Sequence, residues 1–129
     1  MESIVKIIQN KPGFVSMSGA SDEQVQNAEV SLDLEFANEY REYVSAFGAA
    51  AFEGHELTGI CVSPRLNVVS VTETERPKYT DLPKNWYVLE QLHMDDVSIW
   101  QASSGEVYQL IPGAQPMKLC SSLSEYISG

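Results

Sequence analysis

Residues 36–48 of this chain read FANEYREYVSAFG, and this stretch decides the fold. Its apolar residues recur every third or fourth position, as on one face of an α-helix, and mostly polar residues fill the positions between them. The apolar set is Phe36, Tyr40, Tyr43, Val44 and Phe47. Gly48 follows where helices commonly close in a left-handed residue. The pattern therefore predicts a core helix over residues 36–47 that ends in a tight turn.

The same stretch resembles the signature helix of the SMI1/KNR4-like (SUKH) superfamily, whose order is roughly Leu-Pro-x-x-Tyr-Lys-x-Phe-Leu-x-x-Tyr-Gly-Gly. Here Phe36 stands at the leucine, Tyr40 at the first tyrosine and Arg41 at the basic residue. The residues that continue in register are Tyr43, Val44, Phe47 and Gly48. Ala37 departs from the family's proline, and alanines follow Gly48 where glycines are common.

Later segments follow the family's order and extend the resemblance over nearly the whole chain. They are YVLE at 87–90, an acidic pair at 95–96, SGEVY at 104–108 and SLSEYI at 122–127. The resemblance implies an α+β fold with one domain over residues 1–129. In that fold a mostly antiparallel, twisted β-sheet packs against N-terminal helices, and a further helix closes the C-terminus.

The composition is typical of a soluble globular protein, since 43% of the 129 residues are apolar and 20% are charged. A chain of this length can bury a core without disulfides or metals. No apolar run approaches the ~20 residues of a membrane-spanning helix, and the N-terminus lacks the features of a signal peptide. The two cysteines, Cys61 and Cys120, lie far apart, so we expect no disulfide framework and a cytoplasmic location.

The charge is strongly negative: 18 acidic residues against 8 basic ones give a formal net charge of −10. Seven of the acids lie between Asp22 and Glu42, where Arg41 is the only base. Such a field repels nucleic acids and anionic membranes and attracts basic proteins. An acidic run of this kind is also common on surfaces that serve only solubility.

Further helices are predicted on both sides of the signature stretch. A short amphipathic helix at the N-terminus ends at residues 11–13, which read Lys-Pro-Gly. Ser21 and Gln24 form a capping box that opens a second helix, with Val25, Ala28 and Leu32 on its buried side. Ser121 begins a closing helix. Residues 68–75 are ambiguous, because their β-branched side chains favour a strand while the resemblance implies a helix capped by Asn67.

Strands are predicted over most of the remaining chain. Residues 52–62 indicate one or two short strands, residues 86–91, 97–102 and 106–110 an antiparallel set, and residues 116–119 an edge strand. Alternation places Trp86 and Val88 on one face of the sheet and Tyr87 and Leu89 on the other.

No arrangement of residues indicates catalysis, a metal or a cofactor. His55, His93, Cys61 and Cys120 form none of the close pairs that metal sites usually contain. A catalytic thiol needs a base and positive surroundings, so we expect Cys61, between two aliphatic residues, to belong to the core. The adjacent acids Asp95 and Asp96 are expected to form a charged turn rather than a cation site.

The resemblance implies a function in binding proteins. It implies that bacterial SUKH members are immunity proteins, which bind and neutralise a cognate toxin that is often a nuclease. For this acidic chain we expect the toxin to be a basic protein. A regulatory or scaffold module of the same superfamily is the alternative, and a metal-dependent hydrolase is a third. We expect a non-enzymatic monomer or weak dimer that binds neither nucleic acid nor membrane. The residues predicted to contact the partner are Glu53, Glu56, Asp95, Asp96 and Trp100.

Overall fold

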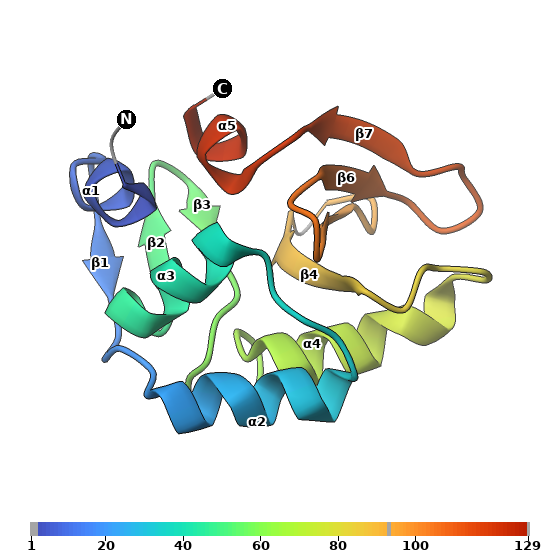
Figure 1. Cartoon of the computed structure of the whole chain (residues 1–129). Coiled ribbons are helices and arrows are strands. Elements are labelled where there is room, and N and C mark those ends of the chain that lie inside the picture. The colour runs from blue at the N-terminus through green and yellow to red at the C-terminus, as the bar shows by residue number, and fades with distance from the viewer. Residues whose placement is uncertain (1–2, 93, 129) are drawn as a thin grey trace.

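Two antiparallel sheets and five α-helices make up the computed structural model (Figure 1), which describes residues 3–92 and 94–128. The helices are α1 (Ile4–Gln9), α2 (Asp22–Leu32), α3 (Asn38–Phe47), α4 (Val68–Glu75) and α5 (Leu123–Ser128), and the 3-10 turn η1 (Arg76–Lys78) follows α4. The smaller sheet has the order β1 (Val15–Ser16), β2 (Ala50–Phe52), β3 (His55–Glu56). The larger has the order β4 (Trp86–Gln91), β5 (Ser98–Ala102), β6 (Val107–Leu110), β7 (Met117–Cys120). The α+β prediction is confirmed, whereas the separate small sheet with strand β1 was not predicted.

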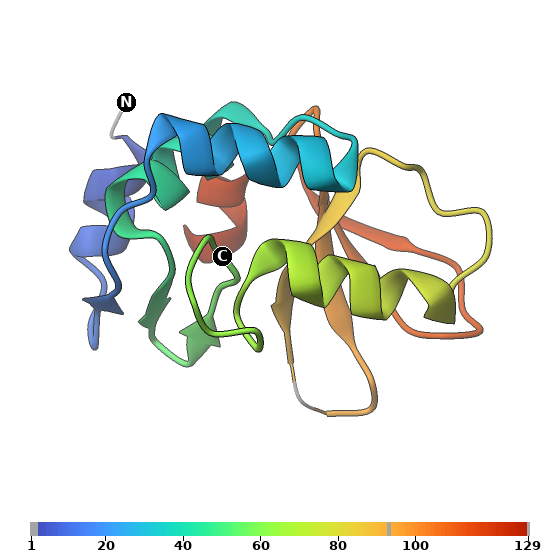
Figure 2. The same ribbon diagram turned by 90° about the horizontal axis from the view of Figure 1, so that it is seen from below.

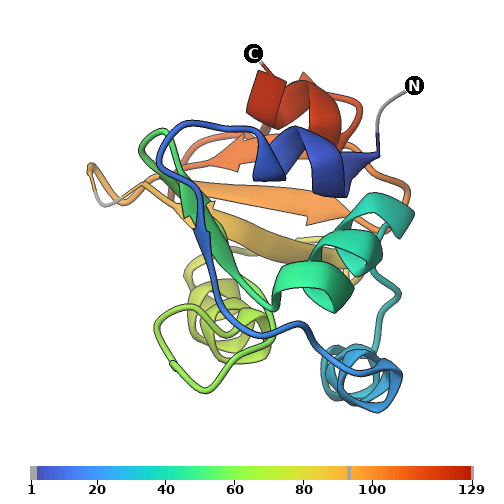
Figure 3. The same ribbon diagram turned by 90° about the vertical axis from the view of Figure 1, so that its left-hand side faces the viewer.

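Strands β4 and β5 of the larger sheet are buried on both faces, while most of the edge strand β7 is exposed. Tyr87 and Leu89 face the main core, which also contains buried residues of α1, α2, α3 and α5. Trp86 and Val88 face a second cluster beneath α4. The predicted alternation along β4 is therefore confirmed. Figure 2 shows α2 and α4 side by side, and Figure 3 shows the two terminal helices, α1 and α5, adjacent at one end.

Aromatic packing fixes α3 against the larger sheet. The Tyr40 and Phe36 rings each lie with their centroids 4.9 Å from that of Tyr87. The Tyr43 hydroxyl donates to the Thr58 carbonyl at 2.8 Å and accepts from the amide of Ala50 at 2.9 Å. α3 begins at Asn38, two residues later than predicted, because Phe36 enters the core from the preceding extended segment.

α3 ends at Gly48 for a steric reason. Gly48 has φ 71° and ψ −68°, so it lies in a γ-turn rather than the predicted left-handed helical conformation. The amide of Ala49 closes this turn on the Phe47 carbonyl at 2.7 Å. A Cβ at Gly48 would lie 2.2 Å from the Ser18 carbonyl oxygen, and one at Gly59 would lie 1.8 Å from that of Gly48. Three backbone segments therefore meet where no side chain fits.

The predicted caps explain two further helices. Ser21 Oγ accepts from the Gln24 amide at 3.1 Å, and Gln24 Oε1 accepts from the Ser21 amide at 2.9 Å, so the capping box is confirmed. Asn67 Oδ1 accepts from the amide of Val69 at 3.0 Å, which starts α4. The ambiguous segment is thus helical despite its β-branched residues. Cys61, in contrast, is only half-buried, so its assignment to the core is wrong.

Three buried tyrosines make the fold sensitive to alkali. Burial raises the pKa of Tyr40, Tyr43 and Tyr87 above the ordinary value of about 10. Because the folded-state pKa is the higher one, their stabilisation is complete below about pH 10 and is lost as the pH rises further. We expect the free energy of unfolding in urea to fall steeply above about pH 10. An unchanged value from about pH 9 to about pH 11 would contradict this burial.

Candidate protein-binding surfaces

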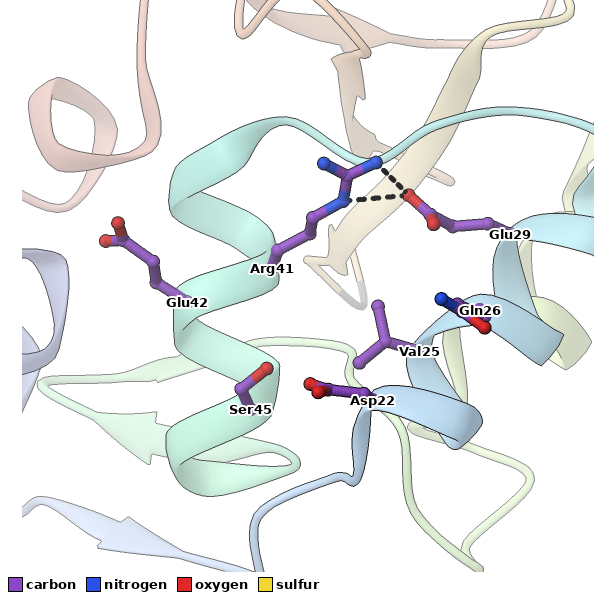
Figure 4. Close-up of a pocket in the computed structure, with 7 residues that line it drawn as sticks. All are labelled: Asp22, Val25, Gln26, Glu29, Arg41, Glu42 and Ser45. Carbon is purple, nitrogen blue, oxygen red and sulfur yellow. Dashed lines mark hydrogen bonds and ion pairs between the residues drawn. The ribbon is translucent and has the colours of Figure 1, made fainter.

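A groove of about 530 Å³ runs between α2 and α3 (Figure 4). The chain turns between the two helices at Asp33, which has φ 55°, and the Leu34 amide then donates to the Glu29 carbonyl at 3.1 Å. Across the groove, Asp22 and Ser45 face each other, while Glu42 points away from α2 at the rim. The lining residues are Asp22, Val25, Gln26, Glu29, Arg41, Glu42 and Ser45.

The one base of the groove is already bound within it. Arg41 donates to Glu29 Oε2 from Nε at 3.0 Å and from Nη2 at 2.8 Å. The same oxygen accepts from the Phe36 amide at 2.8 Å. Arg41 and Glu29 therefore join α3 to α2 and neutralise each other, so this base does not offset the remaining acids.

Five acids of the α2–α3 region remain exposed. They are Asp22, Glu23, Asp33, Glu35 and Glu42. Among the residues that the structure describes, none of the five forms an ion pair with a base. Glu39, the remaining acid of the run, accepts from the Ser124 hydroxyl at 2.8 Å and holds α5 in place. We call the five exposed acids the acidic face: Asp22 and Glu23 on α2, Asp33 and Glu35 between the helices, and Glu42 on α3.

The four predicted partner acids lie at a different place, near the β2–β3 turn and on the β4–β5 loop. Figures 2 and 3 show the β2–β3 turn and the β4–β5 loop at the same end of the molecule. Glu53 and Glu56 line a hollow of about 490 Å³ there. Asp95 and Asp96 line a neighbouring hollow of about 290 Å³, and Gln91 belongs to the lining of both. The structure therefore brings the four predicted acids to one end.

Bases offset much of the charge at that end. Glu53 lies 3.9 Å from Lys11 Nζ, and Glu56 forms a two-bond ion pair with Arg65. Lys78 Nζ lies 3.3 Å from Asp96 and 2.9 Å from the buried Glu75. Asp95 and Asp96 have φ of 51° and 59°, which confirms the charged turn. The acidic face, with no such bases, is the stronger attractor for a positive surface.

Trp100 is not on the surface. Its side chain is fully buried in the second cluster, where the indole Nε1 donates to Ser98 Oγ at 2.8 Å and the ring packs edge-on against Tyr79. The prediction that Trp100 contacts a partner is wrong, because α4 and η1 cover that face of the sheet. A buried tryptophan with a satisfied N–H supports packing instead.

A buried carboxylate, missed by the sequence analysis, joins three elements near the β2–β3 turn. Glu90, 2% exposed, accepts from His55 Nδ1 at 2.7 Å, from the amide of Glu56 at 3.0 Å and from the Tyr126 hydroxyl. Burial and the adjacent Glu90 raise the pKa of Tyr126. β3, β4 and α5 are therefore linked through one side chain.

Comparison with known proteins places the chain in a family. The family model described as SMI1-KNR4 cell-wall (SUKH_5) matches residues 1–128. The chain belongs to the SMI1-KNR4 (SUKH) family. No curated protein matches it. Within residues 3–92 and 94–128 of this SUKH domain, no helix has the length and apolar character needed to cross a membrane.

Of the four residues considered as metal ligands in this SUKH domain, the structure describes His55, Cys61 and Cys120. Over the described part of the chain, no three His, Cys, Asp or Glu side chains converge as metal ligands would. His55 is bound to Glu90, and Cys61 Sγ lies 3.8 Å from the Ser63 carbonyl. His93, the other candidate, lies outside the described residues.

Glutamine at position 90 tests the buried carboxylate of the SUKH domain. In Glu90→Gln an NH₂ group replaces one carboxylate oxygen. This NH₂ donor would face a donor that the oxygen now accepts from, so at least one of the three hydrogen bonds would be lost. We expect the free energy of unfolding to fall by roughly 2–3 kcal/mol. Glu53→Gln, at an exposed position, is the control and should change it by less than about 0.5 kcal/mol. Equal values for the two variants in urea denaturation would disprove the role of Glu90.

Proposed function

We propose that this SUKH-family protein is a cytoplasmic immunity protein that binds a basic toxin domain and neutralises it without catalysis. The observation that carries the proposal is the acidic face, five exposed acids on and between α2 and α3. Arg41, the only base in the sequence from residue 22 to residue 42, is already bound to Glu29. A nuclease toxin presents a positive cleft to its nucleic-acid substrate, and an acidic protein surface can occupy such a cleft in place of phosphates.

Charge and size both suit this role. With a net charge of −10, the protein is drawn electrostatically toward a basic partner, which accelerates encounter and selects against acidic proteins. A stable interface takes ~800 Å² from each partner. The protein has 6865 Å² of accessible surface, so the acidic face and its surroundings are large enough to supply that area.

Regulation of another protein is the second candidate, and the description of the matching family model, which refers to the cell wall, favours it. In that case the acidic face would bind a regulatory protein and not a toxin. The two functions differ in what happens when the protein is absent: loss of an immunity protein is lethal only when its toxin is present.

Co-expression with the neighbouring gene tests the proposal. We expect that the C-terminal domain of a large protein encoded beside this chain stops growth when expressed alone. Growth should return when the chain is co-expressed, and should not return when the chain carries an early stop codon. Growth arrest that persists despite soluble co-expressed protein would contradict an immunity function, and recovery of signalling proteins as partners would favour regulation.

A further inference from the structure

An apolar trough of about 280 Å³ lies on the outer face of the smaller sheet. Its apolar lining comes from Val15, Met17, Ala49, Ala51 and Leu66, and Ser16, Ala50, Glu56 and Arg65 also line it. In the strand register Val15 lies opposite Ala51, and the amide of Met17 donates to the Ala49 carbonyl at 3.0 Å. Residues that lie opposite each other in an antiparallel pair share one face, so these side chains surround a common hollow.

Two of the apolar side chains that line the trough are exposed to solvent and do not belong to the described core clusters. Val15 is 62% exposed and Met17 is 42% exposed, whereas Ala50 and Phe52 point to the opposite face and enter the core. Ala49 and Ala51 carry only a methyl group, so these lining side chains occupy little of the hollow. The volume is below the ~300–1,000 Å³ of small-molecule sites, so it suits one large apolar side chain better than a cofactor.

The trough adjoins the groove of the acidic face through two chain segments. Met17 lines the trough and Asp22 lines the groove, and only residues 18–21 separate them. On the other side, Ala49 lines the trough and Ser45, four residues earlier, lines the groove. A Cβ at Gly19 would lie 2.3 Å from the Ser45 carbonyl oxygen, so the two segments are in direct contact. The two hollows are therefore joined by two short chain segments that touch each other.

We propose that the trough is the apolar anchor point for the basic toxin domain that binds the acidic face, and that it receives one aliphatic or aromatic side chain of that domain. The inference rests on the proposed function and extends it. Charge favours this occupant: the trough is joined by two short chain segments to a negative groove, and a partner with a positive surface seated on that groove lies close to the trough.

An apolar trough next to an acidic groove matches the usual composition of a protein–protein interface. A desolvated apolar centre carries most of the affinity, while charged groups around it set the association rate and the specificity. The ion pair of Arg65 with Glu56 lies at the trough edge, where a polar rim belongs. The acidic face would then govern how fast the toxin binds, and the trough how slowly it leaves.

The test compares aspartate at two exposed apolar positions on strands. Val15→Asp places a charge in the trough, and Met117→Asp, on the 51% exposed Met117 of the edge strand β7 outside both hollows, adds the same charge elsewhere. The probe is the catalytically inactive C-terminal domain encoded beside the chain. We expect Val15→Asp to weaken binding about tenfold or more through faster dissociation, with an unchanged dependence on salt, and Met117→Asp to leave it within about twofold.

A second variant protects the test against misfolding of β1. Val15→Thr with Met17→Gln retains strand-compatible shapes but removes apolar surface, and it should weaken binding about tenfold. If the unmodified chain binds the toxin domain and both trough variants bind equally well, the trough inference is overturned while the proposed function stands. If the unmodified chain does not bind the toxin domain at all, both are overturned.

Discussion

Gly48→Ala is expected to lower the free energy of unfolding by about 3–5 kcal/mol. The added Cβ would lie 2.2 Å from the Ser18 carbonyl oxygen at a residue whose φ is 71°. Steric overlap with backbone, which cannot rotate away, adds to the strain of positive φ. In a domain of this size, the melting temperature should fall by roughly 15 °C.

Gly54→Ala is the control that separates the cost of steric overlap from the cost of a positive φ. Gly54 also has positive φ, 81°, but an added Cβ would meet nothing within 4 Å. Gly54→Ala should therefore cost only about 1 kcal/mol. Gly59→Ala tests the same contact from the other side, since its Cβ would lie 1.8 Å from the Gly48 oxygen. If Gly48→Ala and Gly54→Ala melt at the same temperature, the close backbone approach at Gly48 is not what ends α3.

Charge reversal in the groove is expected to slow association with the basic toxin domain by about 10- to 100-fold at low salt. The variant combines Asp22→Lys with Glu42→Lys, which replaces two acids of the acidic face. The loss should shrink as salt rises, because screening removes the attraction in the unmodified protein as well. Association rates from stopped-flow measurements at several salt concentrations provide the readout.

A matched variant distinguishes the groove from net charge. Glu73→Lys with Glu125→Lys changes two exposed acids on α4 and α5. Each double variant shifts the net charge from −10 by four units, to −6. The α4–α5 variant should slow association by about threefold or less, since the field near a binding site matters more than the total charge. Equal slowing by both variants would mean that the acidic face is not where the toxin docks.

The sequence predicted the helices and strands well because local signals determine them. The period of the signature helix, the capping box at Ser21 and the alternation along β4 are short-range patterns, and each is found in the structure. α4 shows that the intrinsic secondary-structure propensity of the residues does not always decide the structure. Its β-branched residues favour a strand, and the helix forms because Asn67 caps it and Val68 and Val71 are buried.

The sequence could not place the surfaces, because their positions depend on contacts between distant residues. Trp100 is an aromatic residue that follows Asp96 by four positions, yet α4 covers it. Glu90 sits in a strand that carries no mark of a buried charge, and only the fold brings His55 and Tyr126 to it. Val15 lies in a two-residue strand too short for a periodic signal, so the apolar trough was not foreseen.

Titration of the isolated toxin domain with the purified chain tests the central claim most directly. A non-catalytic immunity protein that binds through one surface should reduce toxin activity in proportion to its amount and abolish it at a 1:1 molar ratio. Size-exclusion chromatography should then show one complex that contains both intact proteins. Toxin inactivated by a small fraction of an equivalent, or fully active at an excess of the chain, would contradict the account.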